Sequence, residues 1–195
     1  MPVKRKIPFD CGHFFITFTC YNWLHLLALT DGYDLVYSWL EILKKKGHNI
    51  TGFVLMPNHV HATIAFKKTT KSINSIIGDG KRFIGYAIVD RLEKRGYNDL
   101  LQQLGNAVNK SDKKRGKLHE VWEDSFDWKE CISDAFTWQK LDYMHENPCT
   151  GKWRLAENTV AYADSSARFY ISGVHAKYEV LNFKVLADIN LTARC

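Results

Sequence analysis

Hydrophobic positions along the chain fall into short runs in which β-branched and aromatic residues are concentrated or alternate with polar ones. Runs of this kind are typical of β-strands. Pro57-Asn58 separates two of them and is a turn signal, so these two strands are expected to return beside each other. The predicted strands are residues 13–19, 50–56, 59–66 and a stretch within 119–132 that begins near Val121-Trp122.

Other segments place hydrophobic residues three and four positions apart, which is typical of amphipathic helices. Ser133-Asp134 can cap the last of them and Pro148 ends it, while Gly78 and Gly80 weaken the pattern of the second. The predicted helices are residues 31–46, 72–94 and 134–147. The lysine-rich residues 96–116 are predicted to form a mobile loop, and residues 182–189 a late strand or a final helix.

The resulting order β-α-β-β-α-β-α predicts an α+β fold, in which helices pack on one face of a small antiparallel sheet. We expect one domain over residues 1–195, with a core of about 8–150 and a C-terminal extension of about 150–195. A chain of 195 residues is long enough to bury such a core.

The composition narrows the class of protein. A net charge of +6 with 13% aromatic residues is compatible with nucleic-acid binding, because phosphates attract cations and unpaired bases stack on aromatic rings. The five cysteines are scattered without a CxxC pair, so neither a zinc ribbon nor a disulfide framework is indicated. Without a signal-peptide pattern or a membrane-length apolar run, we expect a cytoplasmic, nucleoid-associated protein with no membrane partner.

His59-Val60-His61 is the first candidate for chemistry. Residues i and i+2 of a strand point to the same face, so both imidazoles would lie side by side while Val60 enters the core. Two neutral imidazoles are half of a plausible divalent-metal site. A histidine pair on a strand is more often structural or merely exposed, so its meaning depends on what else reaches that face.

The second candidate is Tyr143 with Asn147, which share one face of the predicted last helix. The amide oxygen of Asn147 would complete a site for Mg²⁺ or Mn²⁺ with His59 and His61. Tyr143 would be the nucleophile. His145 faces elsewhere on the helix, and we assign it no role as a base.

These segments resemble a known family. MPNHVH (56–61) matches the MPNHxH signature of HUH single-tyrosine transposases, and YMHENP (143–148) resembles the YIHxNP helix of their REP-associated tyrosine transposase branch. AYADSSARFY (161–170) is similar to a further Y-x-x-S-S stretch of that branch, so the resemblance covers roughly residues 8–170. The chain departs from the family pattern after Val121-Trp122, in residues 96–116 and after Pro148. These departures bear on DNA sequence preference and loop geometry more than on the reaction.

The resemblance implies a ferredoxin-like or RRM-like HUH endonuclease fold and a metal-dependent transposase acting on single-stranded DNA near REP-like hairpins. Tyr143 would attack a phosphate and leave a 5′-phosphotyrosine link and a free 3′-hydroxyl. The metal, Mg²⁺ or Mn²⁺, would be held by His59, His61 and Asn147. The resemblance to this branch implies a monomer, whereas compact relatives of the wider superfamily are homodimers. The additional residues after Thr150 also favour a monomer.

Alternative interpretations stay open. Tyr143 could be a packed aromatic and Asn147 a helix-end residue, and Tyr86, Tyr162 and Tyr170 are rival nucleophiles. The protein could be a non-catalytic or domesticated DNA-binding descendant, or a metal-dependent phosphodiesterase without a covalent intermediate. Trp122, Trp128 and Trp138 are expected in the core, and the cations proposed to line a DNA track are Lys67, Lys68, Lys71, Lys81 and Arg82.

Overall fold

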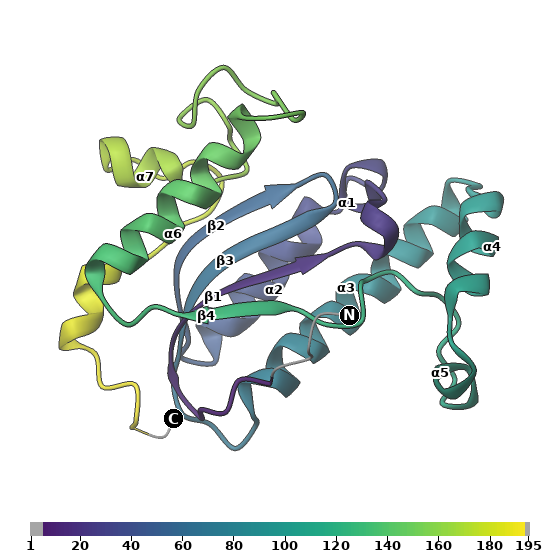
Figure 1. Cartoon of the computed structure of the whole chain (residues 1–195), viewed down its shortest axis with the longest axis horizontal. Coiled ribbons are helices and arrows are strands. Elements are labelled where there is room, and N and C mark those ends of the chain that lie inside the picture. The colour runs from purple at the N-terminus through teal and green to yellow at the C-terminus, as the bar shows by residue number, and fades with distance from the viewer. Residues whose placement is uncertain (1–5, 194–195) are drawn as a thin grey trace.

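The structure is a computed structural model that describes residues 6–193. One antiparallel sheet in the order β2-β3-β1-β4 organises it (Figure 1). The strands are β1 (Gly12–Thr19), β2 (Asn49–Met56), β3 (His59–Phe66) and β4 (Asp127–Glu130). With a helix after β1 and another after β3, this is the ferredoxin-like arrangement, and the predicted α+β class with an antiparallel sheet is confirmed.

Two long helices, α2 (Tyr33–Lys45) and α3 (Ile73–Lys94), cover one face of the sheet. Every second strand residue, such as Phe14, Ile16 and Val60, points into this layer and is buried. Ser72 caps α3 by accepting a hydrogen bond from the Ser75 backbone, and the helix continues unbroken through Gly78 and Gly80. Gly80 is required there, because a Cβ at this position would lie 2.3 Å from Nε1 of the buried Trp39.

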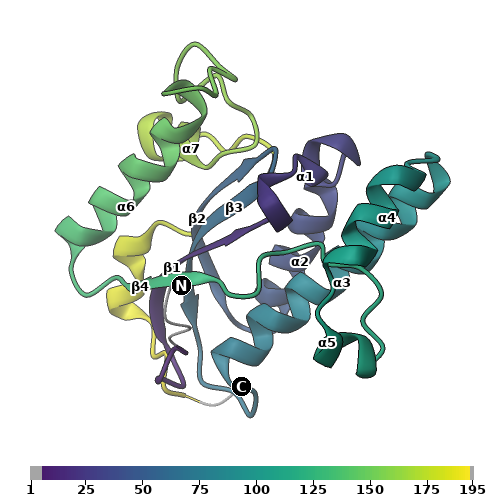
Figure 2. The same ribbon diagram turned by 45° about the vertical axis from the view of Figure 1, so that its right-hand side comes forward.

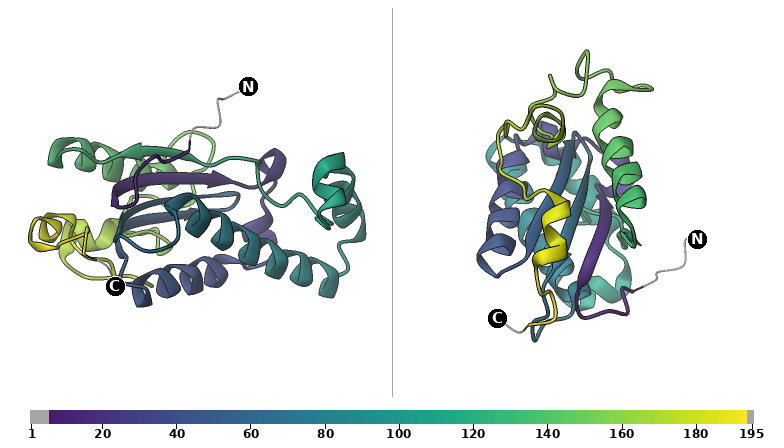
Figure 3. Two further views of the ribbon diagram at one scale, coloured as in Figure 1. Left: turned by 90° about the horizontal axis from the view of Figure 1, so that it is seen from below. Right: turned by 90° about the vertical axis from the view of Figure 1, so that its left-hand side faces the viewer.

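The third predicted helix, α6 (Asp134–Glu146), lies over the opposite face of the sheet (Figure 3). The expectation that the helices pack on one face therefore holds for α2 and α3 and is wrong for α6. Leu141 and Met144 of α6 pack with Val54 and Met56 of β2, so the sheet has a second, smaller hydrophobic core. Alternation alone could not assign α6 to a face, because β2 and β3 are buried on both faces.

Residues 96–116 contain two helices, α4 (Asn98–Ala107) and α5 (Lys110–Lys114). The prediction of a mobile loop in this segment is therefore wrong. Leu104 is fully buried, and Leu100 and Leu101 pack against the main core. Asn109 caps α5 by accepting a hydrogen bond from the backbone of Asp112. The three leucines have the spacing of one face of a helix, but the lysines that follow them give the segment the composition of a loop.

The fourth strand is shorter than predicted. Trp122 forms only an isolated bridge to Cys20, and regular pairing with β1 begins at Asp127. Between them the ammonium of Lys81 donates hydrogen bonds to the carbonyl oxygens of Glu123 and Ser125. Those carbonyls are consequently directed at α3 rather than at a neighbouring strand.

The residues after α6 protect the outer edge of the sheet. Ser165 bridges to Val54, and Asp164 and Ser166 exchange backbone hydrogen bonds with β2. The hydroxyls of Tyr162 and Tyr170 donate to further β2 carbonyls, which assigns these two rival nucleophiles a packing role. An edge strand satisfied in this way is closed to pairing with another chain.

The remaining elements are short: η1 (Tyr21–Trp23), α1 (Leu26–Leu29), η2 (Asn147–Cys149), α7 (Ala167–Ser172) and η3 (Phe183–Asp188). The late element at 182–189 is therefore a 3-10 helix. Figure 2 shows α4 and α5 at one end of the molecule, away from α6 and α7. Within residues 6–193 no helix is long and apolar enough to cross a membrane.

Cys11, Cys20, Cys131 and Cys149 are free thiols, as expected from their spacing, and Cys195 lies outside the described residues. Trp122 is buried and packs edge-on against Phe18. Trp128 packs against Phe14, and Trp138 against Tyr170 in the second core. All three tryptophans therefore serve the cores, as the sequence predicted.

Two glycines of α3 give a matched test of the packing against α2. Gly80→Ala is expected to lower the free energy of unfolding by roughly 1–3 kcal/mol, because its methyl group overlaps the Trp39 indole. Gly78→Ala meets nothing within 4 Å and should raise it by up to about 1 kcal/mol through helix propensity. Urea unfolding followed by circular dichroism measures both, and a shift of the two midpoints in the same direction would contradict the packing.

Candidate functional site

A cleft with a volume of about 760 Å³ opens between α6 and the β1–β4 side of the sheet. Its lining includes His59, His61, Tyr143 and Asn147, so the structure brings together all four residues that the sequence singled out for chemistry. The two histidines come from β3, and the other two residues from the end of α6.

The predicted alternation of β3 places the histidines. His59 pairs with Thr19 and His61 with Thr17 across the β1–β3 ladder, so both face the cleft. Val60 between them is fully buried in the opposite core. The two imidazole rings lie edge to face with their centroids 4.7 Å apart.

The hydrogen bonds of His59 fix which ring nitrogen carries its proton. The Asn58 amide donates to the Trp23 carbonyl at 2.8 Å, so its oxygen faces His59 Nδ1 at 2.7 Å. An amide oxygen only accepts, and Nδ1 of His59 must therefore be protonated. Its Nε2 lone pair is left free to point into the cleft.

Asn147 faces both histidines from the end of α6. Its amide nitrogen lies 2.9 Å from His61 Nε2 and 3.3 Å from His59 Nε2, where it donates to the two lone pairs. His61 Nδ1 accordingly donates to the Thr17 hydroxyl at 2.6 Å. Rotating the Asn147 amide by half a turn would place its oxygen there, so that three lone pairs converge on one point. Such a donor set fits a divalent cation.

Burial keeps these imidazoles neutral. Desolvation lowers the pKa of His59 to about 4, with a smaller contribution from the positive charge of Lys152. Desolvation likewise lowers the pKa of His61 to about 3, and His59 adds to the effect. A neutral imidazole is the form that binds metal.

Tyr143 lies beside the histidines and is 56% exposed to solvent. Its ring centroid is 5.6 Å from that of His61 and 6.2 Å from that of Phe15. Of the rival tyrosines, Tyr86 is on α3, in the layer behind the sheet. Among the tyrosines considered, Tyr143 therefore has both exposure and proximity to the histidine pair.

A close approach of α6 to the sheet sets this geometry. A Cβ on Gly52 of β2 would lie 2.6 Å from both Leu141 Cδ2 and Met144 Cε. His145, which the sequence excluded as a base, is buried, and its Nε2 lies 2.8 Å from Ser166 Oγ. Ser166 also donates to and accepts from the Phe53 backbone, so this contact ties α6 to the edge of the sheet.

The cations proposed for a DNA track lie outside the cleft lining. Lys68 pairs with Asp10, and Lys71 and Arg82 both pair with Asp79. Lys81 is held by two carbonyls, and burial lowers its pKa to about 8. DNA contact by these residues and by Lys67 stays a prediction, separate from the histidine site.

Sequence reasoning missed several cleft residues: Trp23, Lys129, Lys140 and Trp153. Lys140 precedes Tyr143 by three positions, a spacing that places both on one helix face and could have found it. Its Nζ lies 5.9 Å from the centre of the Tyr143 ring and 5.7 Å from that of Phe15. Trp23 and Trp153 lie in irregular turns whose direction the sequence pattern does not indicate.

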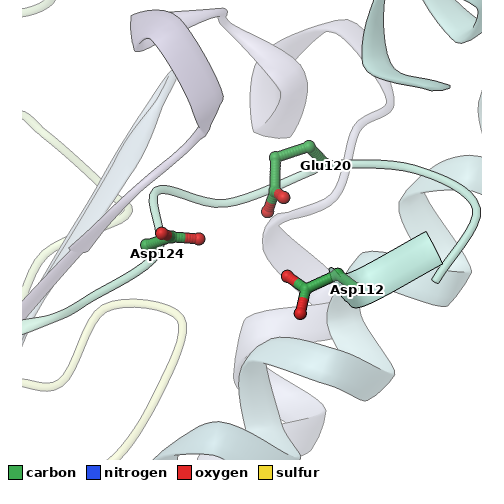
Figure 4. Close-up of side chains that lie close together, drawn as sticks. All are labelled: Asp112, Glu120 and Asp124. Carbon is green, nitrogen blue, oxygen red and sulfur yellow. The ribbon is translucent and has the colours of Figure 1, made fainter. Parts of the chain in front are cut away.

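Asp112, Glu120 and Asp124 form a separate acidic group, with carboxylates turned toward one another (Figure 4). Lys117 pairs with both Asp112 and Glu120, and Arg115 pairs with Asp112. These cations already compensate the negative charge, so we assign no metal site to this group.

The fold is similar to that of a solved protein. A structure described as a REP-associated tyrosine transposase bound to a REP hairpin superposes with a TM-score of 0.62. The match covers 93% of each chain at 15% sequence identity. This chain has the fold of a REP-associated tyrosine transposase.

A second similar structure is a Deinococcus radiodurans R1 protein named as a candidate transposase, with 14% identity over 75% of this chain and 97% of the other. Its TM-score of 0.34 is too low to bear on the fold. No protein-family model and no curated protein matches the sequence.

Because several histidines are buried in their neutral form, the free energy of unfolding is expected to fall in acid. Desolvation lowers the pKa of His145 from 6.5 to about 4, and His13, His59 and His61 are shifted the same way. Between pH 6.5 and pH 4 the histidines of the unfolded chain bind protons that those of the folded chain do not. The stability that is present above pH 6.5 is therefore lost as the pH falls toward 4. Each histidine is expected to contribute roughly 1–2 kcal/mol to the loss at pH 5.

Urea unfolding at pH 7.5 and pH 5.0 in EDTA measures this loss, and His145→Gln should reduce it by the share of one histidine. Equal pH dependence in wild type and His145→Gln would show that His145 is not held neutral by burial.

Proposed function

We propose that this protein is a transposase-like endonuclease and strand transferase acting on single-stranded DNA. One observation supports the proposal most: His59, His61 and Asn147 converge beside the exposed Tyr143, although 86 residues separate His61 from Asn147. A packing role alone does not require two neutral imidazoles and an amide to meet in an open cleft. The fold likeness to a transposase supports the same reading.

In the proposed reaction the Tyr143 hydroxyl loses its proton as its oxygen forms a bond to a DNA phosphorus, and the bond from phosphorus to the 3′-oxygen breaks. The departing 3′-oxygen takes up a proton and becomes a hydroxyl, and the DNA 5′ end stays on Tyr143 as a phosphotyrosine. Attack by a 3′-hydroxyl on this link reverses the step, so strand transfer needs no external energy source.

The donor set fits a divalent metal ion, Mg²⁺ or Mn²⁺, which when bound would polarise the scissile phosphate. His59, His61 and the Asn147 oxygen would hold it. Thr17 and Asn58 fix the two rings by accepting from their Nδ1 atoms. Because imidazole nitrogens bind Mn²⁺ more readily than Mg²⁺, Mn²⁺ is the better first choice for experiments.

Lys140 and Lys129 provide positive charge at the cleft for a DNA backbone. Lys140 lies on α6 with its Nζ 5.7 Å from the centre of the Phe15 ring. Lys129 pairs with Phe15 in the β1–β4 ladder, on the face that also carries Thr17. The REP hairpin in the similar structure suggests hairpin DNA with an unpaired flank as the substrate class here. With its nucleophile and ligands on one chain, the site would work as a monomer.

The test is the formation of a covalent adduct. The protein is incubated with Mn²⁺ and labelled oligonucleotides that contain a hairpin and unpaired flanks, then denatured and separated by electrophoresis. Wild type is expected to yield a labelled protein band, and Tyr143→Phe should reduce it at least 100-fold, because the attacking oxygen is gone. Tyr86→Phe, which changes another exposed tyrosine, is the matched control and should keep the band.

Further arms separate the alternatives. His61→Ala, Asn147→Ala or EDTA should each abolish most of the adduct while DNA binding persists. Cleavage that survives Tyr143→Phe would favour hydrolysis without a covalent intermediate. Binding without cleavage of any hairpin would favour a non-catalytic DNA-binding protein and would contradict the proposed reaction.

A further inference from the structure

Trp23 is an exposed aromatic at the rim of the cleft. Its side chain is 58% exposed and belongs to neither hydrophobic core. The indole lies beside His59, with ring centroids 5.9 Å apart and planes at 71°. A large apolar ring held in solvent next to a candidate phosphate site calls for an explanation other than core packing.

The backbone holds this ring in an unfavourable conformation. Asn22 and Trp23 both have positive φ, at 49° and 56°, which costs a residue other than glycine free energy. Three contacts fix the turn: Glu123 accepts from the Asn22 backbone, the Trp23 amide donates to Cys20, and Asn58 donates to the Trp23 carbonyl. Two of these partners, Glu123 and Asn58, are far away in the sequence, so local preference alone does not fix the turn.

Asn58 connects the ring to the histidine. One side of its amide donates to the Trp23 carbonyl, and the other accepts from Nδ1 of His59. The same fully buried side chain thus sets both the direction of the His59 ring and the position of Trp23. Any group seated on the indole would have a fixed position relative to Nε2 of His59.

Trp153 is a second indole near His59, at 6.0 Å between centroids, and differs from Trp23 in being partly covered. His25 packs against it at 5.4 Å, and Lys152 lies over its ring. Trp23 is consequently the more open of the two indoles that flank the histidine, and its exposed ring is available to a planar ligand.

We propose that Trp23 is a stacking platform for an unpaired nucleobase adjacent to the phosphate held at His59 and His61. The inference rests on the proposed function and deepens it by assigning a subsite to the flanking nucleotide. An unpaired base has an aromatic face that stacking on indole can use, whereas bases inside a duplex already stack on their neighbours. The platform would thereby select single-stranded DNA at the point of cleavage.

The experiment compares two hairpin oligonucleotides, one with an oligothymidine flank and one in which the flank consists of abasic sites. Binding is measured by fluorescence anisotropy in the Tyr143→Phe background, so that no cleavage intervenes. The protein is expected to bind the thymidine flank at least 10-fold more tightly. Trp23→Ala should remove most of that preference and leave the affinity for the abasic flank unchanged, and Trp23→Phe should restore part of it.

Phe83→Ala is the matched control, because Phe83 is 63% exposed but lies on α3 behind the sheet, and it should leave the preference intact. Equal weakening of both oligonucleotides by Trp23→Ala would assign Trp23 a scaffold role and overturn the platform. A loss of self-association in Trp23→Ala, with the base preference retained, would show that a second copy of the chain occupies the ring.

The two proposals fail differently. If wild type forms the Tyr143 adduct but does not distinguish the two flanks, the platform is wrong and the proposed function stands. If the protein binds neither oligonucleotide and forms no adduct, the proposed function is wrong, and the platform falls with it.

Discussion

The close contact between α6 and the sheet at Gly52 is the constraint on which the candidate site depends. Leu141 and Met144 occupy the space that any larger residue at position 52 would need. This depth of packing lets Asn147, just past the end of the helix, reach both histidine Nε2 atoms. If α6 were displaced by the width of one methyl group, that amide would lose hydrogen-bond distance to at least one imidazole.

The same packing determines the chemical state of the histidines. Covering the β3 face desolvates His61 and His59 and keeps them unprotonated, while Thr17 and Asn58 hold the rings by their Nδ1 atoms. Burial of imidazole without partners would only cost stability. Here it leaves two lone pairs directed at one point, and the residues that hold the rings also connect the site to β1 and to the Trp23 turn.

The sequence was most informative where one periodicity dominated. The bounds of β3 agree with the prediction at both ends, and its period of two correctly put His59 and His61 on one face. The spacing also correctly put Tyr143 on α6 and Asn147 one turn later, where it is the C-terminal cap of that helix. What periodicity could not supply was the face of the sheet that α6 covers, because that depends on the fit between Gly52 and two side chains far away in the sequence.

Other misses have similar causes. The buried Leu104 made residues 98–107 a helix, although lysines nearby suggested a loop. The structure also gives the ammonium of Lys81 two carbonyl partners that its position in a charged run does not indicate, while its contact with DNA stays a prediction. The position of Trp23 follows from positive φ angles fixed by Glu123 and Asn58, which no local pattern encodes.

The most direct measurement is the position of Mn²⁺ in crystals of the protein, located by its anomalous scattering. We predict one strong peak bonded to His59 Nε2, His61 Nε2 and the Asn147 side-chain oxygen, with the amide turned from its donating orientation. A peak at Asp112, Glu120 and Asp124 with none at the histidines would contradict the account, and so would a histidine site in which Asn147 still donates to the rings.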